Sequence, residues 1–258
     1  MSVQDTVRID DLSGRRILVT GGSTGIGAAV VTAFAGQGAH VVAHYNQSRD
    51  AAEAVRQQYP DNIWLVQGEM GEKGAAAQVV AKAVEILGGL DGLINNAGGM
   101  LGRIPTTSMT AEHFDKVVDL NAKSVWEASV AAHPHLKAAT DGFIINTTSV
   151  AARNGGGGGA IIYAAAKAFV SSLTRGQAKE FVGDNIRVNA VSPGLVQTPF
   201  HDRYTPPDVL AAQAATIPMG REGAPEECAG TFLFLASKTM SGYLTGQIVE
   251  VNGGQLMP

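Results

Sequence analysis

The sequence predicts an α/β protein built on a doubly wound parallel sheet, with helices on both faces giving three layers. Short apolar runs alternate with longer segments whose apolar residues recur at helical spacing. A glycine-rich turn, G-G-S-T-G-I-G at 21–27, separates the first apolar run from the first helical pattern. No internal repeat or second block of composition interrupts this alternation. Alternating strands and helices of this kind form parallel sheets.

The first half of the chain contains four expected strands after a polar segment that ends near Ser13. Each strand is a short run rich in branched apolar residues, and helical patterns follow the first three. The strands are expected at 16–20, 40–45, 63–67 and 90–95, and the helices after the glycine turn, up to Tyr59 and at 72–87. Strand, glycine turn and helix form a Rossmann-type nucleotide-binding unit, whose ligands bind at the carboxyl ends of the strands.

The second half continues the alternation and completes the sheet. Strands are expected at 142–147, 186–191 and 248–251, and helices at 110–136 and 163–181. A further helix begins at Ala224, where a proline and two glutamates suit the first turn. The segment 198–218, rich in proline and alanine, is expected to form a helical substrate lid. We therefore expect residues 1–258 to form a single Rossmann-type domain with this lid.

Composition and charge argue against several classes of protein. A hydrophobic share of 45% with 16% charged residues describes a compact chain. A net charge of −4 argues against a binder of nucleic acid or anionic membranes. Cys228 is the single cysteine, and no apolar run suits a signal peptide or a membrane span. We expect a soluble cytoplasmic protein with Cys228 buried and no nucleic acid, membrane or metal partner; His133 and His135 are too weak a pattern for a metal site.

The glycine-rich turn is the expected binding site for the diphosphate of a dinucleotide. Glycines let the backbone approach the ligand closely, and the next helix presents free N–H groups to the anion. The residues expected to contact the cofactor here are Gly21, Ser23, Thr24, Gly25, Ile26 and Gly27.

The end of the second strand is expected to meet the adenosine ribose. An acidic residue there favours a 2′-hydroxyl, whereas basic or polar residues accommodate a 2′-phosphate. No Asp or Glu occurs between Gly38 and Arg49, which predicts NADP(H) as the preferred cofactor and NAD(H) as the alternative. The expected contacts are Tyr45, Asn46, Ser48 and Arg49, although Arg49 equally suits a solvated position near a helix start.

Tyr163 and Lys167 form the pattern Y-x-x-x-K and lie one turn apart if this segment is helical. An ammonium about 4 Å from a phenolate, at an effective dielectric of ~20, attracts it by roughly 4 kcal/mol. That attraction would lower the tyrosine pKa by roughly two to three units and create an acid that works near neutral pH. Taken alone, the pattern also fits a helix with an exposed lysine and a half-buried tyrosine.

Further motifs accompany this pair in a fixed order. They are T-G-x-x-x-G-x-G at 20–27, N-N-A-G at 95–98, Asn121 within a helix, Ser149 after the fifth strand, P-G at 193–194 and a terminal V-x-G-G. In these residues, and over nearly its whole length after Ser13, the chain resembles the short-chain dehydrogenase/reductases. The likeness is to the compact branch that includes 3-oxoacyl carrier-protein reductases.

The resemblance implies an NAD(P)(H)-dependent oxidoreductase that interconverts a carbonyl group and a secondary alcohol by hydride transfer. Tyr163 would be the acid or base, Lys167 would lower its pKa and bind the nicotinamide ribose, and Ser149 would polarise the carbonyl. Asn121 would hold a water in a proton path from Lys167 to solvent. Further cofactor contacts are implied for Glu69, Met70, Asn95, Ala97, Gly98, Pro193, Gly194, Val196 and Thr198. Relatives are commonly tetramers, so a homotetramer is expected.

Three features depart from the family pattern. Glu69 stands where an aspartate is usual, and its longer carboxylate would reach the adenine with some adjustment. V-N-G-G replaces the common V-D-G-G near the C-terminus. The loop before Tyr163 carries five consecutive glycines, 155–159, which either give the pocket an adaptable rim or form a tolerated surface insertion.

The sequence leaves the substrate open. A carrier-protein partner favours basic residues near the mouth of the site, whereas A-A-T-D-G and V-G-D-N bring acidic ones. A 3-oxoacyl carrier-protein reductase is one alternative, and a reductase of a small ketone, sugar, polyol or steroid-like substrate is another. His201, Arg203 and Tyr204 of the lid either contact a polar substrate or face solvent. A non-catalytic nucleotide-binding regulator is a further alternative, although both Tyr163 and Lys167 are present.

Overall fold

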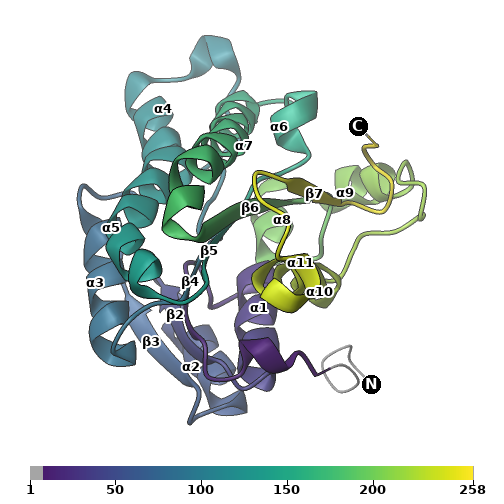
Figure 1. Cartoon of the computed structure of the whole chain (residues 1–258). Coiled ribbons are helices and arrows are strands. Elements are labelled where there is room, and N and C mark those ends of the chain that lie inside the picture. The colour runs from purple at the N-terminus through teal and green to yellow at the C-terminus, as the bar shows by residue number, and fades with distance from the viewer. Residues whose placement is uncertain (1–7, 258) are drawn as a thin grey trace.

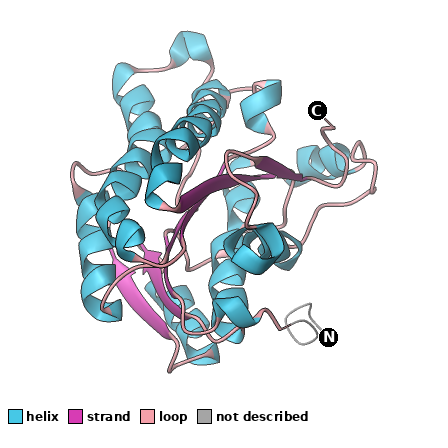
Figure 2. Cartoon of the chain, in the orientation of Figure 1, coloured by secondary structure: helices cyan, strands magenta, loops and turns pink. Residues whose placement is uncertain are grey.

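The computed structural model describes residues 8–257, apart from the side chains of His201 and Asp202. This part of the chain contains a seven-stranded, all-parallel sheet with the order β3-β2-β1-β4-β5-β6-β7 (Figures 1 and 2). The strands are β1 (Arg16–Val19), β2 (His40–Tyr45), β3 (Ile63–Gln67), β4 (Gly92–Asn95), β5 (Gly142–Thr147), β6 (Ile186–Pro193) and β7 (Ile248–Val251). The predicted fold class is confirmed; β4 begins later than expected, and β6 runs on to Pro193.

Helices cover both faces of the sheet and bury its alternating side chains. Ile17 and Val19 of β1 belong to a core with α1 (Gly25–Gly36), α2 (Arg49–Gln58) and α10 (Pro225–Ala236). Leu18, between them, faces a second core with α3 (Ala75–Leu87), α5 (Ser124–Ala138) and α7 (Ile161–Phe181). Successive strand residues point to opposite faces, so an uninterrupted apolar run is what a sheet covered on both sides requires. Cys228 of α10 is buried in the first core, as expected, and burial raises its pKa to about 12.

The remaining helices are short and lie in the connections between the strands and the longer helices. They are α4 (Ala111–Val118), α6 (Ala151–Asn154), α8 (Pro199–Tyr204), α9 (Pro207–Ala214) and α11 (Lys238–Ser241), with the 3₁₀ turns η2 (Asp10–Leu12), η3 (Thr106–Ser108) and η5 (Val182–Asp184). The helices α8 and α9 occupy the segment expected to form a lid. Within residues 8–257 we find no helix that combines the length and apolar character needed to cross a membrane.

The expectation of one continuous helix at 110–136 is wrong in one respect. A π-helical turn, η4 (Asp119–Lys123), separates α4 from α5. Asn121 lies in this turn, and its Nδ2 donates to the Val117 carbonyl one turn earlier, at 2.9 Å. A side chain that enters the backbone ladder in this way widens the helix locally, and such turns are frequent at functional sites.

The strand order creates a crevice beside β1. This strand pairs with β2 on one side and β4 on the other, so the chain reverses its direction of winding there. Val19 lies opposite Ala43 of β2 and Ile94 of β4, which brings the carboxyl ends of the three strands to one edge. Ligands of doubly wound sheets bind at this switch point.

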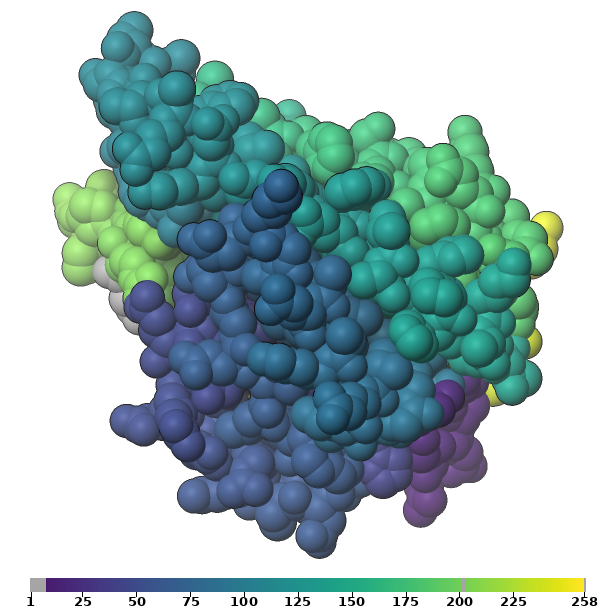
Figure 3. All heavy atoms as spheres, turned by 90° about the vertical axis from the view of Figure 1, so that its left-hand side faces the viewer, coloured from purple at the N-terminus to yellow at the C-terminus, as the bar shows by residue number. Residues whose placement is uncertain are grey.

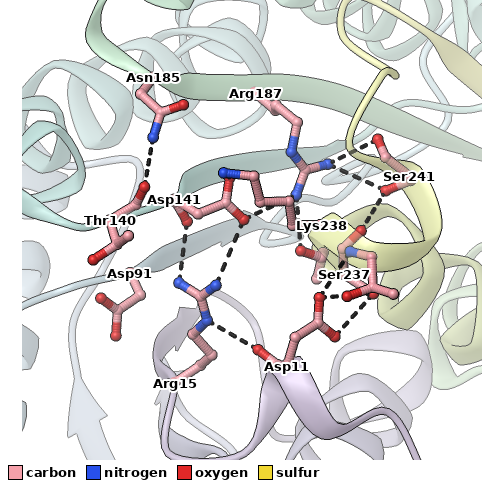
Figure 4. A network of polar contacts seen from close by, with 12 residues as sticks. Asp11, Arg15, Asp91, Thr140, Asp141, Asn185, Arg187, Ser237, Lys238 and Ser241 are labelled. Atoms are coloured by element: carbon pink, nitrogen blue, oxygen red, sulfur yellow. Dashed lines mark hydrogen bonds and ion pairs between the residues drawn. The ribbon is translucent and has the colours of Figure 1, made fainter.

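A network of charged side chains braces the opposite edge of the sheet (Figure 4). The buried Asp141, just before β5, lies 3.5 Å from Arg15 Nη2, 3.7 Å from Arg187 Nη2 and 3.8 Å from Lys238 Nζ. Arg187 is itself buried on β6 and donates to the Leu235 carbonyl of α10 at 2.7 Å. The network therefore connects the amino ends of the strands to α10 and α11, away from the crevice.

Candidate active site

A cavity of about 730 Å³ occupies the carboxyl edge of the sheet, a volume in the usual range for ligand sites. It is lined by the glycine turn, the ends of the central strands, the start of α7 and α8. Most of the residues predicted from the sequence line it: Gly21, Ser23, Thr24, Gly25, Ile26, Gly27, Asn46, Ser48, Glu69, Met70, Ala97, Gly98, Ser149, Tyr163, Lys167, Pro193, Gly194, Val196 and Thr198.

The glycine turn has no room for side chains. A Cβ atom at Gly27 would lie 2.0 Å from the Gly21 carbonyl oxygen, and one at Gly25 would lie 2.9 Å from Thr198 Cγ2. Thr24, the residue before α1, makes no capping bond with its side chain. The first N–H groups of α1 are therefore left for an anion that enters the cavity. These features fit the diphosphate of a nicotinamide dinucleotide.

His44 of β2 fixes the glycine turn, and the sequence analysis did not single it out. Its Nδ1 accepts from the Gly21 N–H at 3.1 Å, and its Nε2 contacts the Gly68 carbonyl at 3.0 Å. Because Nδ1 is the acceptor, the proton is on Nε2 and the ring is neutral. Burial lowers the pKa of His44, which keeps it neutral. The signal in the sequence is a histidine near the end of an apolar strand.

The end of β2 differs in part from the expectation. Asn46 donates to the carboxylate of Glu69, so an acidic group reaches the end of β2 from the loop after β3. Tyr45 is buried and Arg49 is the exposed first residue of α2, and neither lines the cavity. The sequence from Gly38 to Arg49 gives no sign of this carboxylate, because Glu69 follows a different strand, β3.

The two asparagines at the end of β4, Asn95 within the strand and Asn96 directly after it, have different surroundings. Asn95 is buried below the cavity and does not line it, since its Nδ2 donates to Asn146 Oδ1 at 2.9 Å and to Ser129 Oγ at 3.3 Å. Asn96 lines the cavity instead, and its Nδ2 donates to the Gly21 carbonyl at 3.0 Å. The expected cofactor contact of Asn95 is therefore corrected: its side chain joins β4 to β5 and α5, whereas Asn96 holds the glycine turn.

Ser149, Tyr163 and Lys167 meet in the cavity from two elements. Ser149 follows β5, while Tyr163 and Lys167 are the third and seventh residues of α7. Ser149 forms a hydrogen bond with the half-buried Tyr163 phenol, and its Oγ also accepts from the Ala151 N–H at 3.1 Å. Lys167 is buried; its Nζ donates to the Thr147 carbonyl at 2.8 Å and lies 5.8 Å from the Tyr163 ring centroid.

The pKa values of this pair move in opposite directions. Burial raises the pKa of Tyr163 to about 12, and the hydrogen bond with Ser149 offsets part of the rise. Burial also lowers the pKa of Lys167 to about 8. The expectation that the ammonium lowers the tyrosine pKa is wrong for this structure, because desolvation of the phenol is the largest influence on its pKa. Tyr163 is consequently a neutral phenol at neutral pH, the protonation state of a proton donor.

Asn121 does not line the cavity, yet it supports the backbone beside Lys167. Its Oδ1 accepts from the Gly99 N–H at 3.0 Å and its Nδ2 donates to the Gly99 carbonyl at 2.8 Å. With the bond to Val117, both amide hydrogens are used. The side chain therefore has no donor left for the expected water.

The lid contributes two aromatic residues: Phe200, which the sequence did not indicate, and Tyr204, for which substrate contact or exposure to solvent was left open. The Phe200 ring of α8 lies 5.6 Å from the Tyr163 ring, and Tyr204 packs edge-on against Phe200 at 5.2 Å. Both line the cavity. They form an apolar wall on one side of the Tyr163 phenol, at the place where a substrate would enter. The side chain of His201, another expected lid contact, lies outside the described part of the structure.

Comparison with known proteins gives the family. The sequence profile described as enoyl-(acyl carrier protein) reductase matches residues 21–255. The 3alpha-hydroxysteroid dehydrogenase of Mediterraneibacter gnavus is 39% identical, with 94% of this chain and 97% of that protein covered. The 3-oxoacyl-(acyl-carrier-protein) reductase FabG of Thermotoga maritima is 36% identical, with 94% and 98% covered.

Solved structures agree with this assignment. The NADH-dependent reductase A1-R′ complexed with NAD superposes with a TM-score of 0.84 at 37% identity, over 97% of this chain and 100% of that one. The shared fold, the similarity over nearly the full length and the profile match together place the chain in the short-chain dehydrogenase/reductase family.

Proposed function

We propose that the protein interconverts a carbonyl group and a secondary alcohol with a nicotinamide cofactor, through the side chains of Ser149, Tyr163 and Lys167. The family itself supports oxidoreduction by hydride transfer. The proposed residue roles rest on the hydrogen bond between Ser149 and the Tyr163 phenol. The same cavity contains the glycine turn and the start of α1, which has no side-chain cap.

Each of the three residues has its own role in proton transfer to the carbonyl oxygen. In reduction the nicotinamide supplies the hydride to the carbonyl carbon. Tyr163, a neutral phenol, donates its proton to the carbonyl oxygen, and Ser149 donates a hydrogen bond to the same oxygen as negative charge develops. Lys167, with a pKa lowered to about 8, would return a proton to the tyrosine and bind the nicotinamide ribose. For Asn121 we propose a supporting role through the Gly99 backbone, since both of its amide hydrogens are donated to backbone carbonyls.

For the cofactor we propose NADP(H) as the preferred form, with NAD(H) as the alternative. Asn46, Ser48 and the exposed Arg49 near the end of β2 support a 2′-phosphate, and Arg49 has no ion-pair partner among the described residues. Glu69 beside Asn46 favours a 2′-hydroxyl, as does the similarity to a reductase whose printed title is NADH-dependent. Direct comparison of NADPH with NADH decides between them.

For the assembly we propose a homotetramer in the cytoplasm. Phe114 of α4, Trp126 and Val130 of α5, and Phe169 of α7 are each more than two-fifths exposed. Figure 3 shows the α4–α5 segment and α7 next to one another on this side of the molecule. Large apolar side chains gathered on neighbouring helices favour association with another copy.

We also propose that the chain forms a single domain and that the segment 198–218 forms the substrate lid.

Two alternatives remain for the function. The similarity to a 3-oxoacyl-(acyl-carrier-protein) reductase favours an acyl-thioester substrate. The comparable similarity to a hydroxysteroid dehydrogenase favours a compact apolar one. A non-catalytic regulator needs neither the Tyr163 phenol nor the Lys167 ammonium, so their presence argues against it.

The test is an oxidation assay for NADPH and NADH against a panel of small ketones, keto acids, acyl thioesters and steroids. We expect turnover with at least one class and faster turnover with NADPH. The Tyr163→Phe variant is the control and should lose turnover while retaining cofactor binding. Tight cofactor binding without turnover on the whole panel would favour the regulator, and equal or faster rates with NADH would overturn the NADP(H) preference.

A further inference from the structure

Arg103, in the loop after β4, joins three segments at the substrate side of the cavity. Its Nε donates to the Tyr204 carbonyl at 2.7 Å, its Nη1 to the Gly158 carbonyl at 3.0 Å and its Nη2 to Thr205 Oγ1 at 3.3 Å. The lid and the glycine-rich loop before α7 therefore meet on one half-buried guanidinium.

The five glycines allow the loop to fold around this arginine. Gly159 has a φ of +73°, and a Cβ atom on this residue would lie 2.8 Å from the Arg103 carbonyl carbon. A Cβ at Gly157 would lie 3.4 Å from Arg103 Nη1. The loop comes this close only because it has few side chains, which gives the glycine run a specific role beside the substrate.

The positive charge of Arg103 is not balanced within the described structure. All three of its partners are neutral oxygens, and it forms no ion pair with a described carboxylate. A guanidinium has five N–H groups, so one on each terminal nitrogen remains for a ligand. Both Arg103 and Arg203 line the cavity. Among the described side chains that line it, the single acid is Glu69, which lies at the end of β2 with Asn46.

We propose that Arg103, assisted by Arg203, binds a carboxylate of the substrate, so that the preferred substrate is a carbonyl compound that also carries a carboxylate. This inference rests on the proposed function and names the substrate class of the same site. A guanidinium pairs with a carboxylate through two parallel hydrogen bonds, and partial burial strengthens the pair. A neutral amide or hydroxyl substrate would leave the charge without a counterion.

The test compares matched probes that differ only in charge. The keto acids acetoacetate, 4-oxopentanoate and 5-oxohexanoate are assayed beside their methyl esters with the wild-type enzyme. We expect kcat/KM to favour at least one acid over its ester by roughly 10- to 100-fold, the usual range for a hydrogen bond to a charged group. An equal or higher kcat/KM for every ester would overturn the proposal.

Variants separate carboxylate binding from support of the lid. Arg103→Gln should lower kcat/KM of the acid at least tenfold more than kcat/KM of the ester, with the extra loss for the acid mainly in KM. Arg103→Lys should recover part of the preference. Arg56→Gln, which removes an exposed arginine on α2 that pairs with Glu53, is the control for overall charge. An equal loss of kcat/KM for acid and ester in Arg103→Gln would show that Arg103 only supports the lid, and would overturn the proposal.

A binding measurement keeps this test separate from the proposed function. Glutarate should raise the melting temperature of the wild-type protein with NADP⁺ more than glutaramide does, and this difference should disappear in Arg103→Gln. If no ketone is turned over but glutarate binds in this way, the proposed function fails and the carboxylate subsite stands. If ketones are turned over and glutarate gives no such difference, the subsite fails.

Discussion

Replacing Asn121 with alanine tests how the π-helical turn supports the active site. The side chain is fully buried and makes three hydrogen bonds with the backbone of Gly99 and Val117. Each buried backbone group left without a partner costs about 1–3 kcal/mol, so three cost roughly 3–6 kcal/mol after some relaxation. A protein with an unfolding free energy of about 5–15 kcal/mol still folds with this loss over most of that range.

The same substitution should reduce catalysis. A Cβ atom at Gly98 would lie 2.7 Å from Asn121 Oδ1 and 3.2 Å from Lys167 Nζ, so the glycine lies between the amide and the ammonium. Once the amide is lost, the backbone at 98–99 and the position of Lys167 are no longer fixed. We expect kcat to fall at least tenfold, with a smaller change in the affinity for the cofactor.

The assay is urea unfolding followed by circular dichroism, together with steady-state kinetics. Asn62→Ala is the matched control, since its side chain makes one bond at 3.2 Å to the Ala39 carbonyl at a half-buried site and should cost about 1 kcal/mol. The reasoning is refuted if Asn121→Ala loses no more stability than Asn62→Ala, or if its kcat is unchanged.

Three further predictions follow from burial, glycine packing and charge. Burial lowers the pKa of Lys167 from 10.5 to about 8, so the unfolded chain binds a proton that the folded chain releases between these values. The Lys167 contribution to the unfolding free energy should therefore rise with pH from 8 to 10.5, by roughly 3 kcal/mol. The raised pKa values of Cys228 and Tyr163 act in the opposite direction in both proteins, so the difference between the wild type and Lys167→Met in urea titrations should grow by this amount, and a constant difference would contradict the argument. Gly27→Ala should weaken cofactor binding at least tenfold in a fluorescence titration, because its Cβ would lie 2.0 Å from the Gly21 carbonyl oxygen. Gly230→Ala on α10 meets open space and is its control; equal affinities in the two variants would contradict the argument. Asp141→Asn should lower the unfolding free energy by about 3–5 kcal/mol in urea, because it leaves the buried Arg187 without its counterion; an unchanged midpoint would show that solvent already screens the network.

Much of the fold could be predicted because both faces of the sheet are buried. Strands in the middle of the sheet then contain continuous apolar runs, as in Ile17 to Val19, and the helices between the runs carry apolar residues at helical spacing. The glycine turn and the Tyr163–Lys167 pair are also local patterns. Features of this kind depend on neighbours in the sequence, so a single chain reveals them.

The features that were missed depend on partners far along the chain. Asn121 of the π-helical turn reaches the Gly99 backbone, and the sequence between them gives no sign of this contact. Asn95 and Asn96 are adjacent amides whose different roles follow from the direction of each side chain at the end of β4. The pKa of Tyr163 depends on burial and on the hydrogen bond with Ser149, neither of which has a local signal.

In the proposed mechanism the Tyr163 phenol donates the proton to the substrate carbonyl. The most direct test of this step is the single-turnover rate of hydride transfer from bound NADPH to a ketone substrate in Tyr163→Phe, compared with the wild type. We expect a rate at least 100-fold lower, with NADPH affinity within about threefold of the wild type, since general acid catalysis contributes about 10²–10⁴-fold. A rate within a factor of about three of the wild type, at equal NADPH affinity, would contradict the claim and assign the proton to another group.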